Sequence, residues 1–458
     1  MLQPLRSGHM SANRFLASIA ALALLALNPA VAVSADGAAD LEPSSAVPDR
    51  ELTTVPCEAT DTGRTTDSVT AHGLDALARL AAASHASVTA KRAGVQAAQA
   101  EWDAAQLQNW PSPSAQTSPG AGGGRTTVLS LEQSLWTGGR IGALVDAAEA
   151  RTQAANHAVT ESVQSVGFAV VNAYQGFAQA QGRAAVMHRF LARLERYRES
   201  MQRRVQSGAS ASGELELLQA RHALATGQLR LACSNERVAR SQLAVLASVD
   251  LPPEAVVRDA YSPEVPNLGD VLNRSQQLSP VLRRIAQDVR AAQGEVSAKA
   301  AQRWPTVALV AQRHLQRGVP NTQSSTSVGL QLQFNPGAGF SSLASARAAH
   351  AQVDALRASL EAARADLESR IRAEYEELRS AVMRREDGLL HVAAAGRVLA
   401  SYERLFAVGK RSWLDVMNAA RELSDAELAV ADTEAQASAS RYRLALYAVE
   451  PEWMKASP

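Results

Sequence analysis

The sequence predicts a mainly helical protein with a small β part, built from two tandem copies of one plan. Two helical stretches of unusual length support this prediction, one from about Gly139 to Val205 and one from about Ser341 to Phe406. Each follows an extended stretch that begins after a Trp-Pro pair, and each precedes a glycine and a second helix. At a rise of about 1.5 Å per residue, either long helix spans roughly 100 Å and must therefore pack along other helices.

Composition and charge exclude several classes of function. Aromatic residues make up 4% of the 458 residues, which is typical of long helices and coiled coils. The net charge of +1 gives no reason to expect a nucleic acid partner. The nine histidines are scattered without metal-binding spacing, and no nucleophile or pair of catalytic carboxylates stands out. We therefore expect no enzyme, no cofactor and no metal site.

The N-terminus reads as a secretory signal over residues 1–35. Arg6 and Arg14 supply its positive charge, Phe15 to Leu27 is mostly apolar, and Val33-Ser34-Ala35 is a small-residue cleavage site. An uncleaved membrane anchor is the alternative, but the apolar run is too short to span a bilayer. Removal of the two arginines changes the net charge to −1 (+1 − 2). Residues 36–70 are read as a loose N-terminal arm.

The first copy of the plan covers residues 71–253. A helix from about Leu74 to Gln108 ends before Trp110-Pro111, because a residue that precedes proline disfavours the helical conformation. A β-hairpin over 111–135 follows, with strands Ser112–Ser118 and Thr126–Leu135 on either side of a glycine-rich turn. In the helix after the long one, apolar residues recur every seven positions and predict a coiled-coil seam. They are Leu217, Leu224, Leu231, Val238 and Val245.

The second copy covers residues 271–450, after a connector over 254–270 and before a tail over 451–458. It repeats the helix (Val271 to Gln302), the Trp-Pro pair at Trp304-Pro305 and a hairpin over 305–334. Trp304 lies 194 positions after Trp110 (304 − 110). Its last strand, Ser325 to Phe334, alternates apolar and polar residues, as a strand in the wall of a membrane barrel does. A half-buried strand of a soluble sheet is the alternative, but no other sheet is predicted for it to join.

The apolar residues of the second long helix recur with a period of eleven. This period corresponds to about 3.67 residues per turn and predicts helices that pack side by side almost without supercoiling. The residues are Leu356, Leu360, Leu367, Ile371, Leu378, Val382 and Leu389.

Residues 70–449 resemble the TolC family of outer-membrane channel proteins. The segments that carry the resemblance are Leu135–Arg140, Phe334–Gly337, Ser207–Arg221 and Val408–Ala419. The resemblance implies a homotrimer in which each protomer gives four strands to a shared twelve-stranded β-barrel in outer-membrane lipid. The helices then form a periplasmic α-barrel. This assembly agrees with the physics, because two hairpins alone cannot close a barrel and open sheet edges are not tolerated in lipid.

The resemblance also implies a gate where the two helix-turn-helix segments meet. Its pore constriction matches Asp415 and Asn418, the second of which is uncharged here. Its lock matches Arg411 and Glu214, with Phe406 in the place of a tyrosine and so without a hydroxyl. Helix capping is the alternative role for Asp415, and an Arg411–Glu214 surface pair worth less than about 1 kcal/mol is the alternative to the lock.

The family works with a periplasmic adaptor protein and an inner-membrane ABC or proton-driven transporter. By resemblance, the adaptor docks on the tip turns at Ser207, Gly208, Gly213, Gly409 and Lys410. The two cysteines, Cys57 and Cys233, permit one disulfide in an exported chain, which would pin the N-terminal arm to the tube; two unpaired thiols are the alternative.

The expected function is the outer-membrane exit duct of a tripartite export system. Type I protein secretion is favoured, because Cys57 does not follow the cleavage site and an N-terminal lipid anchor is not indicated. A drug or metal-ion efflux duct is the alternative within this class. A structural coiled-coil protein of the periplasm, or the adaptor itself, would be an alternative of another class.

Overall fold

The computed structural model describes residues 72–119, 125–251, 257–258, 267–317, 324–335 and 337–448. The predicted signal peptide and arm, the predicted C-terminal tail and Cys57 lie outside these residues.

The two long helices are confirmed and have the same length. Helix α3 (Arg140–Gln206) and helix α7 (Ser341–Ala407) each contain 67 residues. The helices that follow them, α4 (Ser212–Ala247) and α8 (Trp413–Ala448), each contain 36 residues. Both pairs are offset by 201 positions (341 − 140 and 413 − 212). A residue in the first pair therefore has a structural counterpart 201 positions later.

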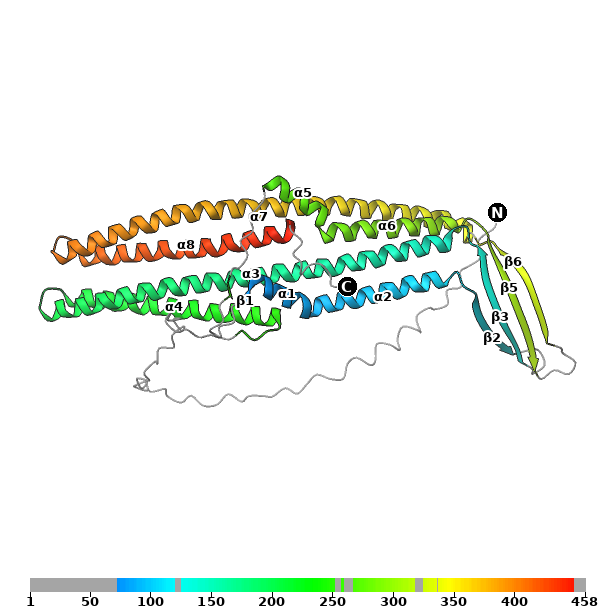
Figure 1. Ribbon diagram of the computed structural model, residues 1–458, viewed down its shortest axis with the longest axis horizontal. Coiled ribbons are helices and arrows are strands. Elements are labelled where there is room, and N and C mark those ends of the chain that lie inside the picture. Colours follow the sequence, from blue (N-terminus) through cyan, green and yellow to red (C-terminus); the bar gives the residue numbers. More distant parts are fainter. Residues whose placement is uncertain are drawn as a thin grey trace, which may run out of the picture. The chain divides into compact units, whose positions relative to one another are not determined.

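Each long helix runs beside two shorter ones placed end to end (Figure 1). Helices α2 (Ala86–Leu107) and α4 lie along α3, and α6 (Pro280–Ala301) and α8 lie along α7. Helices α6 and α8 also pack against α3. The helices thus form a series in which α2 and α4 come first, then α3, then α6 and α8, and α7 comes last.

The two predicted helices that precede the Trp-Pro pairs are each broken in two, so a continuous helix at either place is wrong. Helix α1 (Leu74–Ser84) stops at His85, whose Nδ1 accepts a hydrogen bond from the N–H of Ser87 and caps α2. Helix α5 (Leu268–Leu278) stops at Ser279, whose hydroxyl accepts from the N–H of Leu282, with Pro280 in the first turn of α6. A capping side chain followed by proline favours a new helix start.

Within one chain, the buried row of α4 lies one residue further along than the predicted heptad row, and the predicted row as a helix–helix seam stays a prediction. Leu218, Ala225, Ala232 and Ala239 are buried. Leu224, Leu231, Val238 and Val245 of the predicted row are exposed. The alanines allow α4 to approach α3 closely, and Ala239 lies against the α3 backbone at Gly176. On α7, Ile371 and Leu378 of the eleven-residue pattern are buried, whereas Leu389 is exposed.

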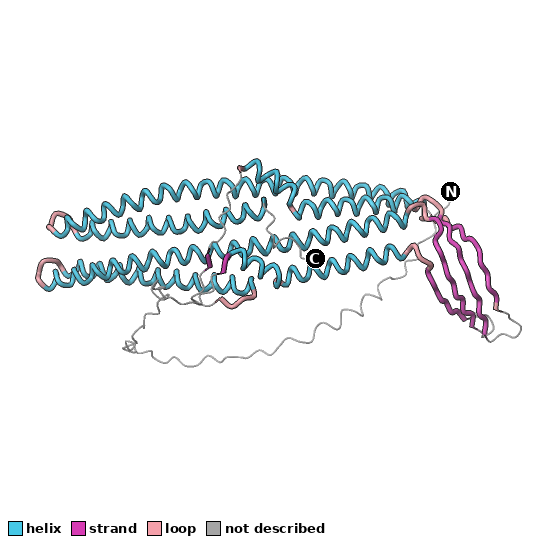
Figure 2. Tube along the Cα trace, in the orientation of Figure 1, coloured by secondary structure: helices cyan, strands magenta, loops and turns pink. Residues whose placement is uncertain are grey.

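The strands form one antiparallel sheet in the order β2-β3-β5-β6, which joins the two repeats through its central pair (Figure 2). The strands are β2 (Ser112–Pro119), β3 (Arg125–Trp136), β5 (Thr306–Arg317) and β6 (Ser325–Gln333). A separate two-residue parallel pair joins β1 (His72–Gly73) to β4 (Val257–Arg258). Among the described residues, no helix is apolar over a length that could cross a bilayer.

We expect Gly294→Ala to lower the unfolding temperature, although alanine favours a helix over glycine by about 1 kcal/mol. A Cβ at Gly294 would lie 2.8 Å from the Cβ of Ala147 and 2.9 Å from the carbonyl oxygen of Ala143, so α6 would have to move from α3. Such overpacking costs about 1–3 kcal/mol. Gly94→Ala in α2 is the control, because it meets no atom within 4 Å and should raise the unfolding temperature. Circular dichroism during heating measures both; equal shifts would contradict the close contact.

Candidate functional site: the helical tip and the two-faced sheet

Both helical hairpins turn through the same backbone motif. Gly208 and Gly409 adopt the left-handed conformation, with φ of 71° and 74°. In the second hairpin, the N–H of Lys410 donates to the carbonyl oxygen of Leu405 at 2.8 Å. This motif ends a helix by satisfying its last carbonyls and favours glycine at the left-handed position. The predicted docking residues are all exposed in or beside these turns: Ser207, Gly208, Gly213, Gly409 and Lys410.

Asp415 caps the start of α8. Its N–H donates to the hydroxyl of Ser412 at 3.2 Å, and its carboxylate accepts from the N–H of Ser412 at 3.3 Å. Hydrogen bonding by Ser412, and then the charge of Arg411, lower the pKa of the Asp415 carboxyl. The side chain is still partly exposed, so a cap and a fixed negative charge reside in the same group. Asn418, one turn further along α8, is exposed.

Arg411 lies close to two residues of its own hairpin. Its guanidinium is 3.6 Å from the carboxylate of Asp415 and 4.6 Å from the centre of the Tyr402 ring. Glu214 lies in the first turn of α4. Among the described residues of one chain, no ion pair joins Arg411 to Glu214. The lock between these two residues therefore stays a prediction about the assembled protein.

Phe406 belongs to an aromatic cluster that joins the two hairpins. Its ring centre is 5.2 Å from that of Trp413, and Trp413 in turn lies 5.4 Å from Tyr197 of α3. The guanidinium of Arg204, also on α3, is 4.6 Å from the Phe406 ring centre. Trp413 is buried at the centre of this cluster. Position 406, at which the resemblance implies a tyrosine hydroxyl, thus carries a phenylalanine ring that makes a cation–π contact with Arg204.

Tyr197 supplies a hydroxyl near the tip, which the sequence analysis missed. It donates a hydrogen bond to the carboxylate of Glu403, and so links α3 directly to α7. Burial, followed by this hydrogen bond, raises the pKa of Tyr197, so the donor keeps its proton. The counterparts of the two residues in the other repeat are Val398 and Gln202. An alignment of the two repeats would have shown that the residue type differs at both positions. It would not have shown that Tyr197 and Glu403 contact each other.

Cys233 lies partly buried on α4 and is disulfide-bonded. Since Cys57 lies outside the described residues, its part in the predicted disulfide stays a prediction. Among the described residues, no group of three potential ligands is placed to hold a metal ion.

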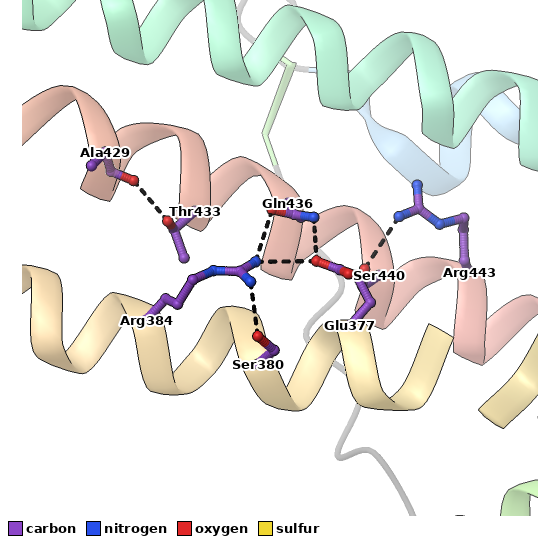
Figure 3. Close-up of polar contacts among 8 residues, drawn as sticks. All are labelled: Glu377, Ser380, Arg384, Ala429, Thr433, Gln436, Ser440 and Arg443. Carbon is purple, nitrogen blue, oxygen red and sulfur yellow. Dashed lines mark hydrogen bonds and ion pairs between the residues drawn. The ribbon is translucent and has the colours of Figure 1, made fainter. Parts of the chain in front are cut away.

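Polar side chains also join α7 to α8 above the tip (Figure 3). Arg384 donates to the Ser380 hydroxyl at 2.8 Å, to Glu377 at 3.1 Å and to Gln436 at 3.2 Å. The amide of Gln436 also donates to Glu377. Arg384 is therefore directed toward its own helix pair.

The four-stranded sheet has one apolar and one polar face. Pro113, Leu131, Ala311 and Val328 lie opposite one another across all four strands and define the apolar face. The neighbouring rung, Ser114, Ser130, Gln312 and Ser327, defines the polar face. Leu309 and Leu330 extend the apolar face, on which Arg313 is a charged exception. A sheet of this kind can separate an apolar medium from water.

Two segments, residues 77–249 and 271–448, match the profile of the family described as outer membrane efflux protein. The chain belongs to this family. The two matched segments cover most of the chain and correspond to the two repeats, which confirms the resemblance to TolC-type proteins. Family membership places this outer membrane efflux protein at the outer membrane, with its helices on the periplasmic side.

The fold agrees with this assignment. The chain is similar to the outer-membrane channel OprN, with a TM-score of 0.73 and 19% identity over 83% of this chain and 90% of that one. VceC from Vibrio cholerae gives a TM-score of 0.71 and 17% identity, over 82% and 95% of the two chains. The CmeC channel from Campylobacter jejuni gives 0.69 and 14%, over 82% and 85%. A search of curated sequences finds no match to the efflux protein.

We expect Tyr197→Phe to loosen the tip of the efflux protein, because it removes the donor to Glu403. A hydrogen bond to a charged group contributes about 1.5–3 kcal/mol, so amides in residues 398–413 should exchange at least about tenfold faster. Hydrogen–deuterium exchange with mass spectrometry measures this change. Tyr402→Phe is the matched control, since it keeps the ring beside Arg411. Equal exchange in the two variants would show that the Tyr197 hydroxyl does not hold the hairpins together.

Proposed function

We propose that three copies of this chain form the outer-membrane exit duct of a tripartite export system. The observation that carries the proposal is the sheet, in which one face is apolar and, among the residues that the structure describes, β2 and β6 each pair on one side only. Unpaired backbone groups are costly in lipid, so the sheet needs further strands at both edges. Closed cyclic symmetry supplies them, and three copies of four strands give a twelve-stranded barrel.

The two tip turns are the proposed docking surface for a periplasmic adaptor protein, and an inner-membrane transporter would supply the energy. Export of a polypeptide by type I secretion is the version of this function that we propose for the cargo. Export of drugs or metal ions is the second version. Loss of one secreted polypeptide from the medium after deletion of the gene would support the first. Unchanged secretion with increased sensitivity to drugs or metals would support the second.

The purified protein in detergent should contain three copies by light scattering and should show a β contribution in circular dichroism. In planar bilayers the same material should conduct ions. A monomer without conductance would overturn the duct, and would favour a structural helical protein instead.

Within this duct, three Asp415 carboxylates would form a ring at the tip that favours cations over anions. We expect Asp415→Asn to reduce the cation selectivity measured from the reversal potential in a salt gradient. Because the pKa of Asp415 is lowered by its hydrogen bonds with Ser412, its charge, and with it the selectivity, should persist to a lower pH than the charge of an ordinary aspartate. Asparagine keeps an oxygen that can cap the helix, so an unchanged reversal potential would leave capping as the role of Asp415.

Arg411→Ser should raise the current that the closed duct conducts in planar bilayers if Arg411 belongs to the lock.

A further inference from the structure

One arginine interrupts the apolar face of the sheet. Arg313 of β5 lies opposite Leu129 of β3, and its side chain is exposed. Among the described residues, no carboxylate forms an ion pair with it. Glu132, the one acidic residue in the four described strands, lies opposite Val310, and both belong to the polar face. The positive charge of Arg313 therefore has no counterion on its own side of the sheet.

Exposed tryptophans lie where the sheet joins the helices. Trp136 ends β3 opposite Val307 of β5, and Trp304 precedes β5 in the chain. Their side chains are 47% and 50% exposed. Tryptophan is enriched at the boundary between lipid and water. In the proposed duct, this end of the sheet therefore lies at the periplasmic boundary of the membrane.

Arg313 lies toward the opposite boundary. It is six residues beyond the pairing of β5 with Trp136 (313 − 307), which is roughly 20 Å along the strand. The next rung of the same face consists of Thr117, Thr127 and Leu315, and the two threonine hydroxyls are 3.2 Å apart. Arg125 follows one rung further, at the start of β3. The apolar face thus ends at Arg313, on the side of the membrane away from the helices.

A shallow hollow of about 540 Å³ adjoins Arg313. Two neighbouring rungs of the apolar face line it, through Pro113, Ala115, Leu129, Leu131, Ala311 and Arg313. The proline and the two alanines are shorter than the leucines beside them, which leaves the space open. Val128 and Glu132 would flank the hollow if it lay on the polar face, but neither lines it. The hollow is therefore on the apolar face, and Arg313 is its one charged side chain.

We propose that Arg313 binds the phosphate of a lipid in the leaflet away from the helices, with an acyl chain of the same lipid in the hollow. The inference rests on the proposed duct, which turns this face toward lipid. A guanidinium donates two parallel hydrogen bonds to a phosphate, and lipid headgroups supply that anion at a membrane boundary. A phosphate free in water would not reach a side chain surrounded by apolar neighbours in a bilayer. Since β5 is a central strand, each copy carries its own Arg313, and a trimer should bind three lipids.

Native mass spectrometry of the purified trimer in detergent tests the phosphate contact. With lipid A added, a phosphorylated lipid of the outer leaflet, the unmodified trimer should retain up to three lipids. Arg313→Gln should lower the retained lipid at least about tenfold, because it removes hydrogen bonds between charged groups. Lipid A from which the phosphates have been removed should be retained equally weakly by the unmodified protein and by the variant.

Arg397→Gln is the matched control, because it removes the same charge from an exposed position near the tip end of α7. Its retention of lipid A should equal that of the unmodified protein. Equal retention of the phosphorylated and dephosphorylated lipids would overturn the phosphate contact. An equal loss in the two variants would show that only net charge matters, and would overturn it as well.

A second pair of variants tests the hollow. Ala311→Phe fills it while keeping the face apolar and Arg313 in place, so it should lower the retention of lipid A at least about tenfold by excluding the acyl chain. Leu309→Phe is its control, because Leu309 lies on the same strand and face but outside the hollow. Equal retention by these two variants would overturn the hollow as the acyl site.

Light scattering and bilayer conductance of each variant separate the inference from the proposed function. If the unmodified protein forms conducting trimers that retain no lipid A, the lipid site is wrong and the duct stands. If the unmodified protein neither assembles nor conducts, the proposed function itself fails.

Discussion

The rest of the structure depends on one constraint: the long helices and the strands need more packing and pairing partners than one chain supplies. Each long helix needs neighbours along its whole length, and each strand needs a partner on both sides. Helix α3 finds neighbours in both repeats, whereas α7 packs along its length against α6, α8 and the short α5 and meets α3 near the tip through Tyr197 and Arg204. In the sheet, β3 and β5 are paired on both sides and β2 and β6 on one. The helices and the sheet are thus incomplete at the same two ends of the series.

The tandem repeat explains why the uncovered helices and the unpaired strand edges occur at equivalent places in the two halves of the chain. Equal helix lengths give every residue of one helix pair a counterpart at the same height in the other pair. The side chains have diverged within that frame. Asp432 accepts two hydrogen bonds from Arg183, whereas its counterpart Leu231 is exposed. The same position of the repeat thus forms an ion pair in α8 and carries an exposed leucine in α4.

Sequence periodicity predicted the long helices and all four strands, because glycine, Trp-Pro pairs and alternation mark their ends. It failed where a single residue decided the outcome. His85 and Ser279 break helices through one capping hydrogen bond each, within patterns that otherwise continue. Periodicity also did not find the row of α4 that is buried within the chain, since it favours large side chains and this row uses Ala225, Ala232 and Ala239. The Tyr197–Glu403 bond joins residues from different repeats, which no spacing within one repeat reveals.

The two hairpins of one chain contact each other at the tip through two kinds of interaction, polar and apolar. Tyr197 with Glu403 and Arg204 with Phe406 join the hairpins of one chain through polar or cationic groups, which water can replace if the hairpins part. The hairpins are also joined by apolar packing, because Leu194 and Met201 of α3 share one buried cluster with Trp413 and Met417 of α8. Separation of the hairpins would expose these side chains to water, which offers them no replacement contact. The apolar cluster therefore contributes most of the free energy that holds the two hairpins of one chain together, and the polar contacts decide which residues face one another.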